Sequence, residues 1–342
     1  MIERYLNPEI NSIWDDQNKF DTWKLVQEKY VETLEELDVA ENGIAKKINQ
    51  SVVQKDEVYK QEEITNHDLA SFVDILQKKV GEGSNWIHYG LTSSDIVDTA
   101  NSVLIMQSLD YVKNLVNDFL STLQEKAMQE KDTLIIGRTH GVYAEETFLG
   151  NIFGNWHLEV ARGLNRLENS KNNISFGKLS GPVGNHSVVT SEMEKLALEK
   201  LNLKPEQFAN QIVSRDRYAE VVSSLGILAS TYERIATNIR SYQRSEISEM
   251  YESFKDGQKG SSAMPHKKNP IGSERITGLA RIMRSYVSTS LENMVLWNER
   301  DISNSSVERI MLPDAFHLIS FMSIELNSIL KHLVINLSLI HI

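Results

Sequence analysis

The sequence is poor in residues that interrupt or cross-link a chain: its 342 residues include no cysteine, 6 prolines and 17 glycines. The absence of cysteine excludes disulfides, thiolate nucleophiles and thiolate metal sites, and it fits a reducing compartment. Because proline and glycine are scarce, few breaks are available and long uninterrupted elements are expected. Most of the chain has the apolar spacing of helices and not the alternation of strands.

Basic charge is also in deficit, since 36 Lys and Arg face 47 Asp and Glu for a formal net charge of −11. General nucleic-acid binding usually needs a basic patch, so we expect no nucleic-acid partner. No run approaches the ~20 apolar residues of a membrane span, and Met1–Tyr5 lacks the apolar core of a signal peptide. The composition predicts a soluble, cytoplasmic protein with no membrane partner, divided into about two domains.

Helical periodicity dominates the chain after residue 92. The longest helix is predicted to begin at Thr92, which has capping-box spacing to Asp95, and to continue to about residue 127. Four further stretches share the period of about 3.6 residues and are predicted as helices: 145–172, 218–242, 271–295 and 306–335, the last with a kink or break at Pro313. Such helices bury apolar stripes against one another. We therefore predict an all-α fold, with a small, mostly helical N-terminal domain over 1–92 and a long antiparallel helical bundle over 93–342.

One segment between two predicted helices concentrates groups that can do chemistry. Residues 257–270 read GQKGSSAMPHKKNP, in which glycines allow close backbone approach and the other residues supply donors and acceptors. The following helix begins at this loop, and its positive end favours negative charge developing on a carboxylate. A solvated basic loop is the alternative that composition leaves open.

Three histidines lie in or beside predicted loops. His140, within the sequence GRTHG, is expected at the start of the next helix, where a ligand can reach it and it can move a proton near neutral pH. Asp68 follows His67 and either orients its imidazole or caps the helix after it. His88 directly precedes the loop 89–95. A structural role is the alternative for each histidine.

The segment 297–309 brings Arg300, Ser305 and Arg309 close together in sequence. Arginine forks and hydroxyls suit phosphate oxygens, so these residues predict a phosphate-binding set. A surface helix with charge pairs at i,i+4 spacing is the alternative. No two histidines have ligand spacing and cysteine is absent, so no metal site is predicted.

Together these segments resemble a known superfamily. The pattern SSxMPxKxNP over 261–270 is similar to the signature loop of the fumarase/aspartase superfamily, whose members eliminate fumarate from a succinyl group. Within it, the chain is most similar to the adenylosuccinate lyase family, on motifs that cover nearly the whole sequence: MIERY at 1–5, HYGLTSSD at 88–95, GRTHG at 137–141, His266 in the signature, and ERDIS followed by SSVER over 299–309. The resemblance implies a fold of three largely helical domains, the middle one a long bundle that packs into a homotetramer.

The resemblance also implies an activity without a cofactor: cleavage of adenylosuccinate to AMP and fumarate, and of the succinylated aminoimidazole carboxamide ribotide (SAICAR) to AICAR and fumarate, in purine biosynthesis (AMP and IMP). Ser262 would take the Cβ proton, and His140, paired with Glu274, would protonate the leaving nitrogen. Lys267 and Asn269 would hold the substrate carboxylate. Further residues would line the site or bind the nucleotide: His67 (also counted as catalytic), Asp68, His88, Thr92, Ser93, Thr139, Gln211 and Ser261, with Arg4, Tyr5, Arg300, Ser305 and Arg309 on the phosphate. One site would draw on three subunits, so the partners are a small nucleotide and further copies of the chain.

The sequence departs from the family pattern at several places. Where the family often has other residues, this chain has Asn66, Tyr143, Glu146, Ser214, Asn298 and Asn304. Family members continue for about 80–100 further residues, a plausible small domain. Seven of the ten residues over 333–342 are apolar and do not resemble the family. We therefore expect the C-terminal helical domain to be absent from this chain.

Two alternatives to this function stay open at the level of sequence. A sibling lyase acting on argininosuccinate is disfavoured by His266 and by the predicted phosphate set. An inert helical assembly protein is disfavoured because the acid, the base and the carboxylate-holding residues are all present, and favoured by the missing domain.

Overall fold

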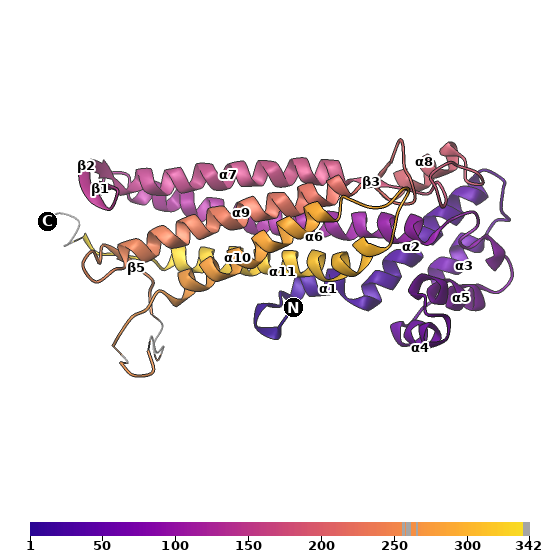
Figure 1. The fold of residues 1–342 in the computed structure, drawn as a ribbon, viewed down its shortest axis with the longest axis horizontal. Coiled ribbons are helices and arrows are strands. Elements are labelled where there is room, and N and C mark those ends of the chain that lie inside the picture. The colour runs from indigo at the N-terminus through magenta and orange to yellow at the C-terminus, as the bar shows by residue number, and fades with distance from the viewer. Residues whose placement is uncertain (255–256, 258–260, 265, 338–342) are drawn as a thin grey trace.

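The computed structural model describes residues 1–254, 257, 261–264 and 266–337 (Figure 1). The predicted loop over 257–270 is called the chemical loop below. Its residues 258–260 and Pro265, and the tail 338–342, lie outside the described residues. None of the helices in the described part combines the length and apolar character that a membrane crossing requires.

Helices dominate the described chain. Two short 3-10 turns, Glu3–Tyr5 and Ser84–Trp86, accompany the α-helices, which are α1 Pro8–Trp14, α2 Asp16–Glu36, α3 Ile44–Gln50, α4 Lys55–Thr65, α5 Asp68–Val80, α6 Ser93–Gln129, α7 Leu149–Ile174, α8 Ser191–Glu199, α9 Arg215–Tyr242, α10 Ile271–Glu292 and α11 Ser303–Lys331. The strands are short and form three two-stranded pairs: β1 Leu134–Thr139 with β2 Val142–Phe148, β3 Phe176–Gly177 with β4 Lys204–Pro205, and β5 Met250–Tyr251 with β6 Val334–Ile335. The predicted all-α fold class is confirmed.

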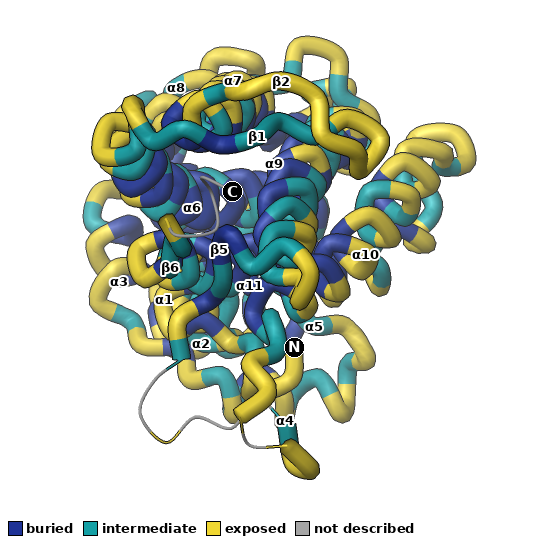
Figure 2. The backbone as a smooth tube through the Cα atoms, turned by 90° about the vertical axis from the view of Figure 1, so that its left-hand side faces the viewer, coloured by how far each residue is buried: buried dark blue, intermediate teal, exposed yellow. Residues whose placement is uncertain are grey.

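The five long helices α6, α7, α9, α10 and α11 form the antiparallel bundle that periodicity predicts (Figure 1). Their apolar stripes meet in one cluster that includes Phe119, Trp156, Tyr232 and Phe316, all fully or almost fully buried. Viewed along the bundle, buried positions face the centre, while α10 and α7 present exposed outer surfaces (Figure 2). Helix α6 alone has 37 residues and spans about 55 Å.

A second apolar cluster packs α2, α3 and α5 around Phe20, Trp23 and Phe72. It also takes in Ile96 and Ala100 at the start of α6 and Leu198 on α8. Residues on both sides of position 92 thus share one core, although α6 begins at Ser93. The boundary between domains 1–92 and 93–342 stays a prediction.

Two sequence expectations about the helices are wrong. The helix predicted from residue 145 begins only at Leu149, because the residues before it form β2 of a hairpin. Helix α11 continues through Pro313, so the break predicted there is wrong, while the alternative of a kink stays a prediction. A proline costs a helix one N–H bond and a local clash, and packing of α11 against the rest of the core outweighs that cost here.

Candidate functional site

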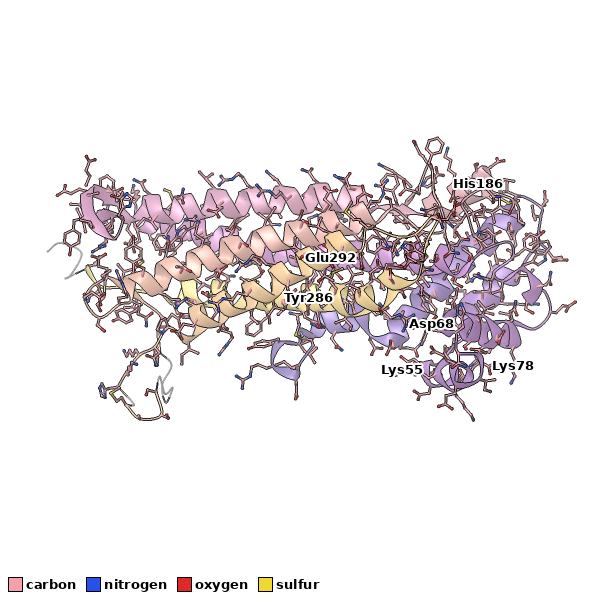
Figure 3. The ribbon with its side chains drawn as sticks, in the orientation of Figure 1. Lys55, Asp68, Lys78, His186, Tyr286 and Glu292 are labelled. Carbon is pink, nitrogen blue, oxygen red and sulfur yellow. The ribbon has the colours of Figure 1, made fainter. Side chains whose placement is uncertain are left out.

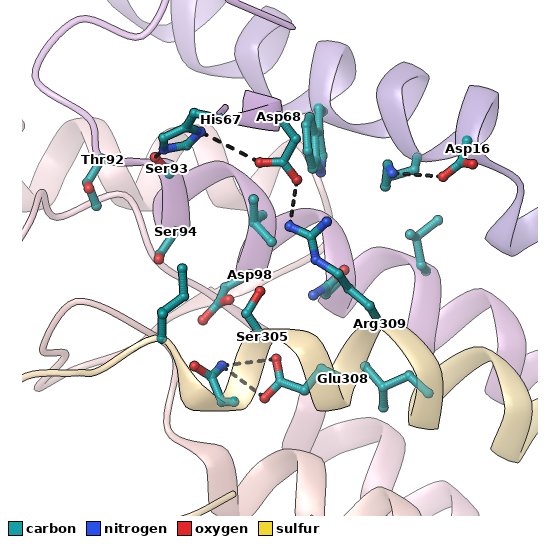
Figure 4. A pocket seen from close by; sticks show the side chains of 18 of the residues that line it. Asp16, His67, Asp68, Thr92, Ser93, Ser94, Asp98, Ser305, Glu308 and Arg309 are labelled. Atoms are coloured by element: carbon teal, nitrogen blue, oxygen red, sulfur yellow. Dashed lines mark hydrogen bonds and ion pairs between the residues drawn. The ribbon is translucent and has the colours of Figure 1, made fainter. Parts of the chain in front are cut away.

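A cleft of about 510 Å³ opens where α5, α6 and α11 approach one another, at the end of the bundle next to the N-terminal helices (Figure 4). Eight of the predicted site residues line it: His67, Asp68, Thr92, Ser93, Gln211, Arg300, Ser305 and Arg309. Thr92 and Ser93 are held by the predicted capping box, in which the Asp95 carboxylate accepts the N–H of Thr92 at 2.8 Å. Asp95 is in turn buried against the Lys178 ammonium. The structure therefore brings together predicted residues from four separate stretches of sequence.

Arg300 is a half-buried cation in the cleft that meets only neutral acceptors among the described residues. Its guanidinium donates to Ser94 Oγ at 3.1 Å, Gln211 Oε1 at 3.2 Å and Asn304 Oδ1 at 3.3 Å. Burial lowers the pKa of Arg300, which shows that its charge is incompletely solvated. A guanidinium held in this way is poised to bind an anionic group.

The floor of the cleft is a buried ionic network that sequence reasoning missed. Arg215 donates to both oxygens of Asp98, at 2.5 and 2.9 Å, and to both of Glu308, at 2.8 and 3.1 Å. Asn304 donates to Glu308 as well, at 3.1 Å. This network joins α6, α9 and α11 and fixes the position of Asn304, which holds Arg300. The sequence carried one signal of this network: Asp98, Arg215 and Glu308 are charged residues at positions of their helices that face the core.

Asp68 bridges two other predicted residues (Figure 4). Its Oδ2 accepts from Arg309 Nη2 at 2.7 Å, and its Oδ1 lies 3.6 Å from His67 Nδ1. His67, not Asp68, caps α5, since its Nδ1 accepts the N–H of Ala70 at 3.4 Å. Its Nε2 lies 3.3 Å from Ser93 Oγ at the cleft. Of the two roles predicted for Asp68, the capping role is therefore wrong.

His88 is fixed in one protonation state by Gln27. The N–H of His88 donates to Gln27 Oε1 at 2.9 Å, so the amide nitrogen of Gln27 faces His88 Nδ1 at 3.0 Å and donates to it. The ring is therefore neutral, with its proton on Nε2. Burial, together with the nearby His67, lowers the pKa of His88 to about 4. His88 is not among the residues that line the cleft.

His140 does not start a helix, contrary to the prediction, but occupies the tip of the β1–β2 hairpin. Thr139 pairs with Val142, and the two residues between them have positive φ, 56° for His140 and 78° for Gly141. This is the pattern of a type I′ turn, which needs residues that tolerate left-handed backbone. The His-Gly dipeptide between two strand-like runs was the overlooked signal. The turn leaves the His140 side chain exposed.

The described part of the chemical loop lies at the same end of the bundle as this hairpin (Figure 1). Ser262 and Lys267 are exposed there, and Ser261 Oγ accepts the N–H groups of Ala263 and Met264 at 3.3 and 3.2 Å. Glu274 stands exposed in the first turn of α10. Asp68 marks the opposite end in Figure 3. Neither His140 nor Ser262 is among the residues that line the cleft in one copy of the chain.

Arg4 and Tyr5 lie apart from both groups, in the first 3-10 turn. Arg4 is exposed, and the Tyr5 ring packs edge-on against Phe321 with centroids 5.0 Å apart. Neither residue lines the cleft. Across the described residues, no three His, Cys, Asp or Glu side chains are placed to hold a metal ion.

Comparisons with known proteins agree on the relationship. The profile of a family described as lyase matches residues 18–284. The chain is 44% identical to adenylosuccinate lyase of Thermotoga maritima over 98% of this chain and 78% of the relative. It is 43% identical to that of Helicobacter pylori and 42% identical to that of Bacillus subtilis, over 98% of this chain and 76% and 78% of those relatives.

Solved structures share the fold at lower sequence identity. A fumarate lyase from Mesorhizobium superposes with a TM-score of 0.90 at 20% identity, covering 99% of this chain and 78% of that one. A 3-carboxy-cis,cis-muconate lactonizing enzyme from Pseudomonas putida superposes with a TM-score of 0.89 at 21% identity, covering 98% and 77%. These structures establish the fold alone.

Proposed function

The chain belongs to the adenylosuccinate lyase family and is a carbon–nitrogen lyase, and we propose that it releases fumarate from adenylosuccinate, giving AMP, and from SAICAR, giving AICAR. The observation that carries this proposal is identity above 40% to relatives of that name over nearly the whole chain. No comparison favours the argininosuccinate or the inert alternative. A cytoplasmic location and a role in purine biosynthesis belong to the same proposal.

The cleft is proposed to hold the nucleotide. Arg300 offers a cation with neutral partners, and Ser305 and Arg309 line the same cleft. Phosphate oxygens would satisfy the guanidinium better than the three neutral oxygens it now meets. Arg309 forms an ion pair with Asp68, so a phosphate that binds Arg309 would compete with the Asp68 carboxylate for its guanidinium. Arg4 and Tyr5 would join the phosphate only from another copy of the chain.

The elimination needs a base, an acid and a stabilised carbanion. Ser262 Oγ, activated by its loop and by nearby cations, takes the proton from Cβ of the succinyl group. The electron pair passes into the adjacent carboxylate, whose added negative charge Lys267 and Asn269 stabilise. The C–N bond then breaks, and His140 donates a proton to the leaving nitrogen while Glu274 pairs with its imidazole. The substrate's own carboxylate carries the charge, so no cofactor is required.

These roles require several copies of the chain, and we propose a homotetramer in which three subunits build each site. The cleft lies at the start of α6 and the His140 hairpin follows its end, about 55 Å away along a 37-residue helix. Exposed apolar residues on and after α10, such as Leu291, Val295 and Trp297, supply surface for association.

Ultraviolet absorbance of purified chain mixed with adenylosuccinate, with light scattering on the same sample, tests the function. Conversion to AMP by a tetramer is expected. Mixing the inactive variants His140→Ala and Ser262→Ala should then restore part of the activity, because some sites draw both intact residues from different chains. A mixture as inactive as its parts would refute the shared site, and a wild-type tetramer that leaves adenylosuccinate intact would refute the function.

A further inference from the structure

Two buried carboxylates lie three residues apart between α9 and the chemical loop. Glu249 and Glu252 are 4% and 7% exposed and flank the strand β5. Strand β5 pairs with β6, and the Glu249 carbonyl accepts the N–H of Asn336 at 2.9 Å. The segment is thereby attached to the chain that follows α11. Buried carboxylates are costly unless they are well paired, so their partners define what they do.

Glu249 holds the hairpin that carries His140. Its two oxygens accept from Arg138 Nη1 at 2.9 Å and Nη2 at 2.5 Å. This contact raises the pKa of Arg138. Arg138 pairs across the hairpin with Tyr143, and the next pair, Thr139 with Val142, closes the turn. A bidentate ion pair of this kind fixes both distance and orientation, so it anchors the hairpin one residue pair from its tip.

Glu252 holds the other end of the chemical loop. Its carboxylate accepts the N–H of Gly272 at 3.2 Å and of Ser273 at 2.7 Å, at the start of α10. Its own N–H donates to Gln243 Oε1 at 3.0 Å, and Gln243 Nε2 donates to the Lys268 carbonyl at 3.0 Å. The chain entering the loop and the chain leaving it are thus tied to one glutamine. Glu274 stands one residue beyond the capped N–H groups.

We propose that Glu249 and Glu252 are positioning residues, which fix the His140 hairpin and the loop of Ser262 and Lys267, respectively, on the body of their own chain. The inference rests on the proposed function for the roles of those three residues. Among the described residues β1 and β2 pair only with each other, and the turn at the hairpin tip is exposed. The Arg138–Glu249 pair therefore controls where the acid stands. A shift of about 1 Å in a reacting group can cost on the order of 100-fold in turnover.

The test compares Glu249→Gln and Glu252→Gln with Glu246→Gln, a control on the same segment whose side chain is exposed. A glutamine keeps the shape but loses the charge and one acceptor. We expect kcat to fall about 10- to 100-fold in both variants with KM changed less than about twofold, and no change in the control. The double variant Arg138→Gln/Glu249→Gln should match Glu249→Gln, since both lack the ion pair. Arg138→Gln should lower kcat at least as much, because it leaves the buried Glu249 carboxylate without its cation.

Amide hydrogen exchange supplies a readout that does not depend on activity. Glu249→Gln should increase exchange over 134–148, and Glu252→Gln should increase it at 271–274, while light scattering reports an unchanged mass. Wild-type kcat and exchange in both variants would overturn the proposal. So would losses that appear only together with a lower mass or melting temperature, which indicate a purely structural role. An inactive wild type that still shows these exchange differences would instead refute the proposed function.

Discussion

At the scale of single residues, buried polar side chains fix the hydrogen bonds of their neighbours around the cleft and at His88. Gln27 has no exposed surface, and both the oxygen and the nitrogen of its side-chain amide form hydrogen bonds with His88. The buried Asp98, Arg215 and Glu308 do the same for Asn304 and, through it, for Arg300. Each arrangement fixes hydrogen-bond direction, which a solvent-exposed side chain would be free to change.

His88 should make folding stability depend on pH. Its pKa is about 4 in the folded protein against 6.5 in the free side chain, so the unfolded chain binds more protons between these values. The contribution of the neutral His88 to the free energy of unfolding is therefore complete above pH 6.5. It is lost as the pH falls from 6.5 to about 4, by roughly 3 kcal/mol at the lower end. Relative to His88→Gln, the wild type should lose unfolding free energy between pH 7 and 5, measured by urea denaturation.

The exposed His332 provides the control for this experiment, since His332→Gln should leave the pH dependence of the wild type unchanged. A difference between wild type and His88→Gln that stays constant from pH 7 to 5 would contradict the neutral, Gln27-held imidazole.

At the scale of elements, the hairpin is the least regular part of the bundle. Between the pairs Ile136–Glu146 and Arg138–Tyr143, two residues of β2 stand opposite one of β1, which is a β-bulge. The turn beyond it needs left-handed backbone at His140 and Gly141. Such a hairpin re-aims a side chain at the cost of local stability, which suits the role proposed for His140 in a site shared between copies of the chain.

Gly141→Ala should destabilise the hairpin through backbone strain alone. A Cβ at Gly141 meets nothing within 4 Å, but its φ of +78° costs an L-residue about 1 kcal/mol. Gly278→Ala is the matched control, because a Cβ there also meets nothing within 4 Å and the backbone is helical. We expect faster hydrogen exchange over 134–148 and lower kcat for Gly141→Ala. Gly278→Ala should be neutral or slightly stabilising. Equal behaviour of the two variants would remove the turn conformation from the argument.

At the scale of the whole molecule, the long bundle separates the groups that the proposed reaction needs. The start of α6, where Thr92 and Ser93 line the cleft, lies at one end of the bundle. The hairpin and the described part of the chemical loop lie at the other end (Figure 1). Apolar side chains on and after α10 stay exposed in a single copy, with Val295 and Trp297 each 80% exposed. Burying them against further copies would both stabilise the fold and complete the sites.

Val295→Asp should therefore weaken assembly and activity together. A carboxylate buried at an interface without a partner costs several kcal/mol, so light scattering should report a lower mass and turnover should fall by a similar fraction. Ile64→Asp is the control, since Ile64 on α4 is 77% exposed and lies away from the bundle. Full mass and activity in Val295→Asp would place the interface elsewhere.

Much of the fold was predictable because it is local. The Thr92–Asp95 capping box and the apolar stripe of α6 depend on residues three and four apart, and both are found as predicted. The β1–β2 hairpin was missed because its signal is a two-residue turn inside a short stretch. Arg215 meets Asp98 and Glu308 across 117 and 93 residues of sequence, and no local pattern encodes such a meeting.

The sequence by itself determined the helical class, the five long helices and, through its motifs, the family. These follow from periodicity and residue identity, which act over a few positions of the chain. Only the tertiary structure decided that eight predicted residues share one cleft, that His140 sits on a strand turn, and that α6, about 55 Å long, separates this turn from the cleft. The physical reason is that packing of distant apolar stripes, and the ion pairs it buries, sets which side chains meet.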